Sequence, residues 1–107
     1  MKFVLRYRPE VVADIDAGRR WYEERSAGLG SDFVVQCSED LARIQRNPQL
    51  VGVDAYGVGS LRIRRFPYVI HYRIEGEMIV VFAVMFGGRD PSAWQERIER
   101  SDAANSR

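Results

Sequence analysis

Nine consecutive apolar residues at positions 78–86, MIVVFAVMF, constrain the fold of this chain more than any other feature. A helix that crosses a membrane needs about 20 such residues, so this run is too short to serve as one. A short apolar run rich in Val, Ile and Phe is typical of a strand buried inside a sheet. We therefore expect no membrane-spanning segment and a core built around a β-sheet.

Other parts of the sequence carry strand patterns as well. Residues 61–65 and 66–74 are predicted strands, and Glu75 with Gly76 supplies the turn into the apolar run. Pro67 cannot donate a hydrogen bond to a strand ladder, which predicts a bulge or a strand start near that point. At the beginning of the chain apolar and basic residues alternate, which predicts a short opening strand with one buried face.

Between the opening strand and the later ones, apolar residues recur at helical spacing. Pro9 suits the first turn of a helix, and residues 27–32 combine two glycines with two N-cap candidates, Ser31 and Asp32, so one helix should end there and another begin. Two helices joined this closely should form an antiparallel hairpin. Their apolar stripes are Val11, Ile15, Gly18 and Tyr22 on the first helix and Phe33, Cys37, Leu41 and Ile44 on the second.

The second helix should end at Asn47 and Pro48, and residues 49–60 are expected to form a loop. Asp90 followed by Pro91 predicts a last helix about two turns long, which must pack on the rest of the protein to be stable. We expect a single domain over residues 1–100 and a flexible tail over residues 101–107. The order strand, helix, helix, three strands, short helix predicts an α+β fold, with a mostly antiparallel sheet covered on one face by the helical hairpin.

Charge is balanced in total and unevenly placed along the chain. The 16 basic and 15 acidic residues give a net charge of +1, so total charge does not predict nucleic-acid binding. Arg62, Arg64, Arg65 and Arg73 lie in a stretch without a single Asp or Glu. Strand alternation puts Arg62 and Arg64 on one face, and a neighbouring strand can bring Arg73 or Arg89 close to them. This arrangement suits phosphate or an acidic protein segment, and an ordinary solvated sheet face is the alternative.

Several site types are not expected. Cys37 is the single cysteine, so the chain has no internal disulfide, and it fits a reducing cytoplasm. One histidine and one cysteine on different elements have no metal-ligand spacing. Residues 57–60 are glycine-rich but precede a strand and lack a following lysine, so they do not predict a nucleotide site. We expect a cytoplasmic protein with no metal, no cofactor and no small-molecule substrate.

The order and spacing of several segments resemble a known family of proteins. The strand region reads RRFPYVIHYR at residues 64–73, IVVFAV at 79–84 and RDP at 89–91, and the helical region reads WYEE at 21–24, GLG at 28–30 and Phe33. These segments, from about residue 11 to residue 94, resemble the RelE/ParE toxins of type II toxin–antitoxin systems. The resemblance implies the same strand-helix-helix-strands fold, a cognate antitoxin as partner and bacterial growth arrest. It leaves the target open, because the family includes ribosome-dependent mRNA endoribonucleases and inhibitors of DNA gyrase on one scaffold.

Cleavage of RNA would need more than arginines, because one group must accept a proton while another donates one. His71 is the only histidine, and strand alternation places it on the same face as Arg73. On a helix-free face it would adjoin the basic cluster; the alternative is a packed or exposed strand histidine. The resemblance implies a histidine at position 86, as in many members of the family. This chain has Phe86 there, so it lacks that titratable group. An endoribonuclease would use Arg62, Arg64, Arg73, His71 and Arg89 as catalytic residues.

The turn that contains Arg89 and the residues after it offer two further candidates. Residues 87–91 form a glycine-rich turn that opens a helix, where backbone N–H groups can hold an anion unless Asp90 caps the helix itself. Trp94 either stacks on a base or anchors the last helix on the sheet. The scarcity of proton-transfer groups favours a ParE-like gyrase inhibitor over a RelE-like endoribonuclease acting on ribosome-bound mRNA. A catalytically silent member that binds its antitoxin is a third reading. The expected surface for the target or antitoxin comprises Arg62, Arg64, Arg65, Arg73, Arg89 and Trp94.

Overall fold

The computed structural model describes residues 2–105, and its fold is the predicted α+β arrangement. The elements are β1 (Val4–Tyr7), α1 (Pro9–Arg25), α2 (Leu29–Arg46), β2 (Val58–Arg62), β3 (Tyr68–Glu75), β4 (Met78–Phe86) and α3 (Ser92–Asn105). None of the helices within the described residues is long and apolar enough to span a membrane. The predicted order of strands and helices is therefore confirmed.

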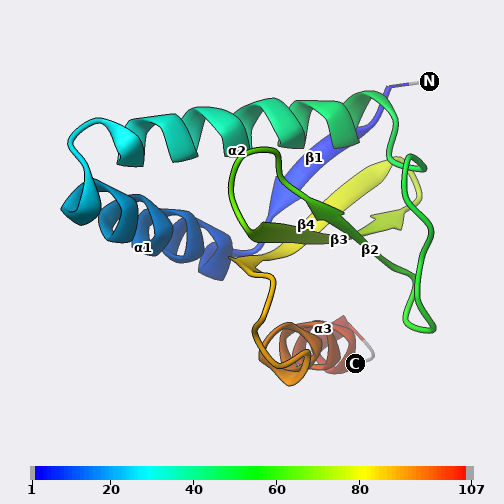
Figure 1. Cartoon of the computed structure of the whole chain (residues 1–107). Helices are drawn as coiled ribbons and strands as arrows, with labels where there is room; N and C mark the ends of the chain where they lie inside the picture. The colour runs from blue at the N-terminus through cyan, green and yellow to red at the C-terminus, as the bar shows by residue number, and fades with distance from the viewer. Residues whose placement is uncertain (1, 106–107) are drawn as a thin grey trace.

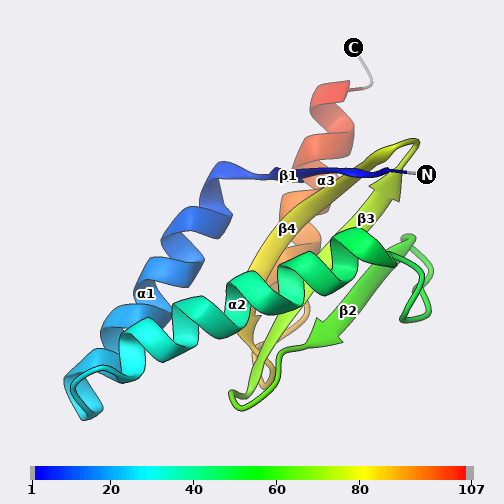
Figure 2. The same cartoon turned by 90° about the horizontal axis from the view of Figure 1, so that it is seen from above.

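The sheet has four strands in the order β1-β4-β3-β2 (Figure 2). β4 pairs antiparallel with β3 and parallel with β1, and β2 pairs antiparallel with β3, so the sheet is mostly antiparallel as expected. Every residue between the two ends of β4 is buried. The unbroken apolar run at β4 follows from this position, because a strand with neighbours on both edges and covered faces has no side exposed to water.

Helices cover both faces of the sheet, which differs from the prediction of one covered face. The hairpin of α1 and α2 packs on one side, where the helical stripes predicted from the sequence join the main core. α3 lies against the opposite side (Figure 1), and its Trp94 and Ile98 pack with Phe82 and Met85 of β4. The expectation that the face away from the hairpin stays open is wrong, because α3 buries apolar residues of β4 there.

The boundaries of the later elements also differ from the predictions. β2 begins at Val58 and ends at Arg62, so the predicted loop is shorter and the strand does not reach residue 65. β3 begins directly after Pro67, which confirms the predicted strand start. α3 has 14 residues instead of about two turns, and Ser101 within it is buried. α3 thus continues through residues 101–105 of the segment predicted as a tail; residues 106 and 107 lie outside the described part of the chain.

The turn between α1 and α2 is capped in a way that local sequence did not predict. Gly28, at φ 88°, is the N-cap of α2 in place of Ser31 or Asp32, and as a glycine it has no side chain with which to cap the helix. The carboxylate of Glu23 on α1 instead accepts hydrogen bonds from the backbone N–H groups of Gly28 and Gly30, both at 3.0 Å. A carboxylate at this position satisfies otherwise unpaired N–H groups at a helix start, so the turn is fixed by the preceding helix.

Candidate functional site

The predicted cluster of arginines is divided between two sides of the molecule. Arg62 is the last residue of β2 and pairs with Val69 of β3. Arg64 lies beyond the strand, and its backbone N–H and its Nε donate to Asp40 of α2 at 2.9 Å and 3.1 Å. The strand alternation ends before Arg64, so the prediction that Arg62 and Arg64 share a face is wrong. Arg65 follows with φ 72°, a strained value for a residue other than glycine.

Asp40 is the residue that holds this loop, and the sequence reasoning missed it. Its side chain is 0% exposed and accepts hydrogen bonds from Gln36, Arg43 and Arg64. Burial by itself would raise the pKa of Asp40, but these hydrogen bonds and the nearby guanidinium charge hold the pKa below its usual value. The spacing of residues could have predicted the burial of Asp40, because positions 33, 37, 40 and 44 lie on one face of the helix.

His71 and Arg73 lie under α3 and not on an open face. The ring of His71 stacks on the indole of Trp94 with 4.5 Å between centroids, and its Nδ1 lies 2.8 Å from the hydroxyl of Ser60. Burial lowers the pKa of His71 to about 4, so the ring is neutral at neutral pH. Arg73 forms ion pairs with Glu75 at 2.9 Å and with Asp102 of α3 at 2.6 Å.

Register separates Arg73 from Arg62 as well. Arg73 pairs with Val58, four residues from Arg62 along β2, a separation of about 13 Å at 3.3 Å per residue. The predicted approach of Arg73 to Arg62 is therefore wrong. Trp94 is 8% exposed, stacks on His71 and packs with Phe82 and Met85 of β4. These contacts favour the anchoring of the last helix over the stacking of a base, the two alternatives that the sequence left open.

Arg62 and Arg89 are the two predicted site residues that stay exposed beside the turn after β4. A Cβ built on Gly87 would lie 3.7 Å from Nη1 of Arg62, and Arg89 follows two residues later. Neither arginine has an ion pair among residues 2–105. The carboxylate of Asp90 accepts a hydrogen bond from the backbone N–H of Ser92 at 2.9 Å. Asp90 therefore caps α3 itself and takes a backbone donor that could otherwise hold an anion.

An aromatic hollow lies next to this turn, because Phe86 precedes Gly87 and the carbonyl of Pro67 accepts the backbone N–H of Gly87 at 2.8 Å. Its volume is about 270 Å³, and its walls are Trp21, Tyr22, Pro67, Tyr68 and Phe86. Phe86 is 51% exposed, and Trp21, which is 49% exposed, carries the guanidinium of Arg25 at 3.3 Å from its ring centroid. Phe86, at the position where the resemblance implies a histidine, is thus an exposed apolar side chain.

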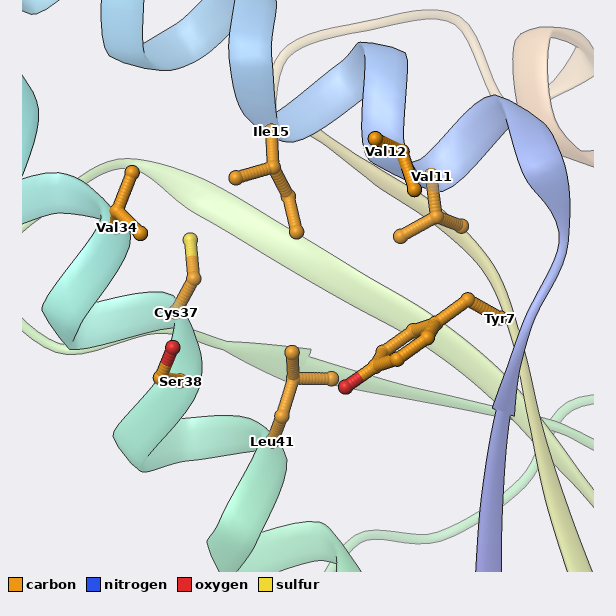
Figure 3. Close-up of a pocket in the computed structure, with 8 residues that line it drawn as sticks. All are labelled: Tyr7, Val11, Val12, Ile15, Val34, Cys37, Ser38 and Leu41. Atoms are coloured by element: carbon orange, nitrogen blue, oxygen red, sulfur yellow. The ribbon is translucent and has the colours of Figure 1, made fainter.

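A second hollow runs between the two helices of the hairpin (Figure 3). Its volume is about 130 Å³, and it is lined by Tyr7, Val11, Val12, Ile15, Val34, Cys37, Ser38 and Leu41. Most of these side chains point toward one another across the gap between α1 and α2 in Figure 3. Burial raises the pKa of the Cys37 thiol to about 12, so Cys37 contributes here as an apolar side chain and not as a nucleophile. Within residues 2–105 there is no group of three or more side chains suited to hold a metal ion.

Comparison with known families identifies the fold that carries these features. A family model described as the ParE toxin of type II toxin–antitoxin system, parDE, matches residues 5–91, which is more than half of the chain. The chain belongs to the ParE toxin family. It is therefore the toxin component of a type II toxin–antitoxin system. α3 lies beyond the residues that the family model matches.

Two solved structures share the fold of this ParE toxin. The chromosomal ParDE system from P. aeruginosa has a chain that is 22% identical, with a TM-score of 0.69, covering 79% of this chain and 96% of that one. A mutant of the E. coli toxin RelE in the free state is 11% identical, with a TM-score of 0.63, covering 94% of this chain and 98% of that one. No curated protein matches the sequence. At these identities the two structures establish the fold and leave the target of this ParE toxin open.

Proposed function

We propose that this toxin arrests bacterial growth by binding and inhibiting DNA gyrase and does not cut mRNA. The observation that carries the proposal is the lack, among the described residues, of an available general base beside the exposed Arg62 and Arg89. His71 is buried under Trp94 with its pKa lowered to about 4, and Asp90 caps α3. Burial raises the pKa of Tyr68, so this phenol stays protonated and cannot act as the base for the 2′-hydroxyl.

Cleavage of a phosphodiester requires a base for the 2′-hydroxyl and an acid for the leaving oxygen. An arginine stabilises negative charge but stays protonated, so it cannot act as the base. Phe86 occupies the position at which the family resemblance implies a histidine, and its ring offers no proton. Exposed arginines beside an aromatic hollow are instead typical of a protein-binding surface, where Arg and aromatic residues contribute most of the binding energy.

The antitoxin is the second partner that we propose. The hollow between α1 and α2 is apolar, and Val12 at its rim is 67% exposed. An amphipathic helix lays its apolar face into a groove of this kind. We infer that an amphipathic segment of the antitoxin covers the helical hairpin and keeps the toxin from its target.

The test is a supercoiling assay with purified gyrase together with a translation extract that reports mRNA cleavage. We expect the toxin to inhibit supercoiling and to leave the mRNA intact. The double variant Arg62→Ala/Arg89→Ala should lose inhibition, because it removes the two exposed charges beside the aromatic hollow. Arg46→Ala, at the exposed end of α2, is the matched control and should inhibit as the native toxin does.

Cleavage of the mRNA without any effect on gyrase would overturn the proposal in favour of an endoribonuclease. Antitoxin binding without either activity would identify a silent member of the family. Incorporation of labelled precursors after induction gives the same distinction in cells: DNA synthesis should stop before protein synthesis does if gyrase is the target.

A further inference from the structure

We propose that the aromatic hollow beside the turn after β4 binds an acidic segment of gyrase. One large apolar side chain of that segment fills the hollow, and a neighbouring carboxylate is held by Tyr68 and Arg89. This inference rests on the proposed inhibition of gyrase and names the chemistry of the segment that the toxin recognises. The hollow has a rigid aromatic floor, two exposed aromatic walls and hydrogen-bond donors without acceptors.

The floor of the hollow is fixed by the main core. The ring of Tyr22 packs on Phe33 with 5.2 Å between centroids and on Phe66 with 4.8 Å. The ring of Tyr68 packs on Phe33 with 4.8 Å between centroids. Phe33 and Phe66 are buried core residues. Rings packed in this way keep their positions whether or not a ligand is bound, so binding requires little ordering of the site.

Two walls of the hollow, Trp21 and Phe86, are about half exposed. The guanidinium of Arg25 covers one face of the Trp21 indole. A Cβ built on Gly88 would lie 2.9 Å from Cε1 of Phe86, so the ring of Phe86 lies in space that only a glycine at position 88 leaves free. Large apolar side chains exposed around one hollow are typical of an interaction site, where a partner's side chain removes them from water.

The hollow also presents hydrogen-bond donors. Among residues 2–105 the hydroxyls of Tyr22 and Tyr68 form no hydrogen bond, whereas that of the buried Tyr72 donates to the carbonyl of Pro48 at 2.6 Å. Burial raises the pKa of Tyr68 and the charge of Arg89 acts in the opposite direction, so this guanidinium lies within electrostatic reach of the phenol. A phenol O–H and a guanidinium together suit a carboxylate.

The charges around the hollow are mostly positive. Arg62 and Arg89 have no ion pair within the described part of the chain. The pair between Arg25 and Glu24 is long, at 3.9 Å, and exposed. Asp90 is engaged at the start of α3. An acidic segment therefore finds complementary charge here, and a basic segment is repelled.

The test titrates the full-length toxin with three pentapeptides with blocked ends and follows the indole N–H of Trp21 and the ring of Phe86 by NMR. The peptides are Asp-Glu-Leu-Glu-Asp, its amide counterpart Asn-Gln-Leu-Gln-Asn, and Asp-Glu-Gly-Glu-Asp, which lacks the apolar side chain. We expect saturable shifts at both rings with the first peptide and about tenfold weaker binding of the other two. A twelve-residue oligothymidylate, the comparison anion, should leave both rings unshifted.

Two substitutions separate the carboxylate site from the apolar site. Tyr68→Phe keeps the ring and removes the O–H, so it should bind the acidic peptide about tenfold more weakly and the amide peptide as before. Tyr56→Phe is the matched control, because Tyr56 is an exposed tyrosine that does not line the hollow. Phe86→Ala removes an apolar wall and should weaken the binding of the acidic and the amide peptide alike.

Equal affinity of the acidic and amide peptides, or equal affinity of Tyr68→Phe and Tyr56→Phe for the acidic peptide, would overturn the proposed site. Absence of shifts at millimolar peptide, or binding of the oligothymidylate at these rings, would do the same. The supercoiling assay distinguishes this failure from failure of the proposed function. Native toxin without effect on gyrase would overturn the function, whereas inhibition that Tyr68→Phe retains in full would overturn only the site.

Discussion

Replacement of Asp40 by asparagine tests whether the loop that carries Arg64 depends on one buried carboxylate. Oδ1 of Asp40 accepts hydrogen bonds from Arg43 at 3.0 Å and from Nε of Arg64 at 3.1 Å. Oδ2 accepts from Gln36 at 3.0 Å and from the backbone N–H of Arg64 at 2.9 Å. An asparagine has the same shape but only one acceptor oxygen. Whichever oxygen becomes the amide nitrogen, two donors lose their acceptor.

The size of the effect follows from these contacts. A hydrogen bond to a charged group contributes about 1.5–3 kcal/mol, so the loss of two such bonds should lower the free energy of unfolding by about 3 kcal/mol or more. Removal of one partner from a buried charge cluster costs about 3–5 kcal/mol, which agrees with that figure. For a protein of this size the melting temperature should fall by about 12–20 °C.

Urea denaturation followed by circular dichroism measures this change. Asp16→Asn is the matched control, because Asp16 pairs with Arg19 and Arg20 on an exposed helix face and its loss should leave the midpoint unchanged. The pKa of Asp40 lies below its usual value of 3.8 in the folded state. Its contribution is therefore full above about pH 4 and is lost as the pH falls through the folded pKa. Equal midpoints for the two variants would refute the role assigned to Asp40.

Two further predictions concern α3 and the face that it covers. His71 has a folded pKa of about 4 against an ordinary value of 6.5, so the unfolded chain binds a proton more readily and stability should fall as the pH drops from about 6.5 to about 4. His71→Gln should flatten the dependence of the urea midpoint on pH in that range, and an unchanged slope would contradict the assignment. Arg97 donates to Asp14 at 2.6 Å and to the carbonyl of Phe82 at 2.9 Å. The side chains of Arg97 and Asp14 are largely buried, so Arg97→Ala should loosen α3. The measurement is the His71 pKa by NMR, which should rise toward 6.5 in Arg97→Ala and stay near 4 in Arg100→Ala, whose ion pair with Glu10 is long and exposed.

Much of the fold was predictable because its signals are local. Helical spacing identified the buried stripes of α1 and α2, and the apolar run identified β4 as a buried strand. Pro67 marked the start of β3 for the simple reason that it lacks an N–H. The parallel pairing of β1 with β4 left no such mark, because strand alternation is the same for either direction of pairing.

The candidate site was predictable only as a list of residues. Arg62 and Arg89 are exposed as expected, whereas Arg64, His71 and Arg73 are engaged in contacts within the protein. Asp40 lies 24 residues from Arg64 in sequence, and Asp102 lies 29 residues from Arg73. No local pattern connects residues so far apart.

The sequence by itself determined the order of the elements, the central strand and the resemblance to toxins, because periodicity and turn chemistry act over a few neighbouring residues. Tertiary structure alone decided that α3 covers the second face of the sheet and buries His71. It also decided which arginines are neutralised by carboxylates and which stay available at the surface. Charges interact through space, so their partners are known only once the chain has brought distant segments together.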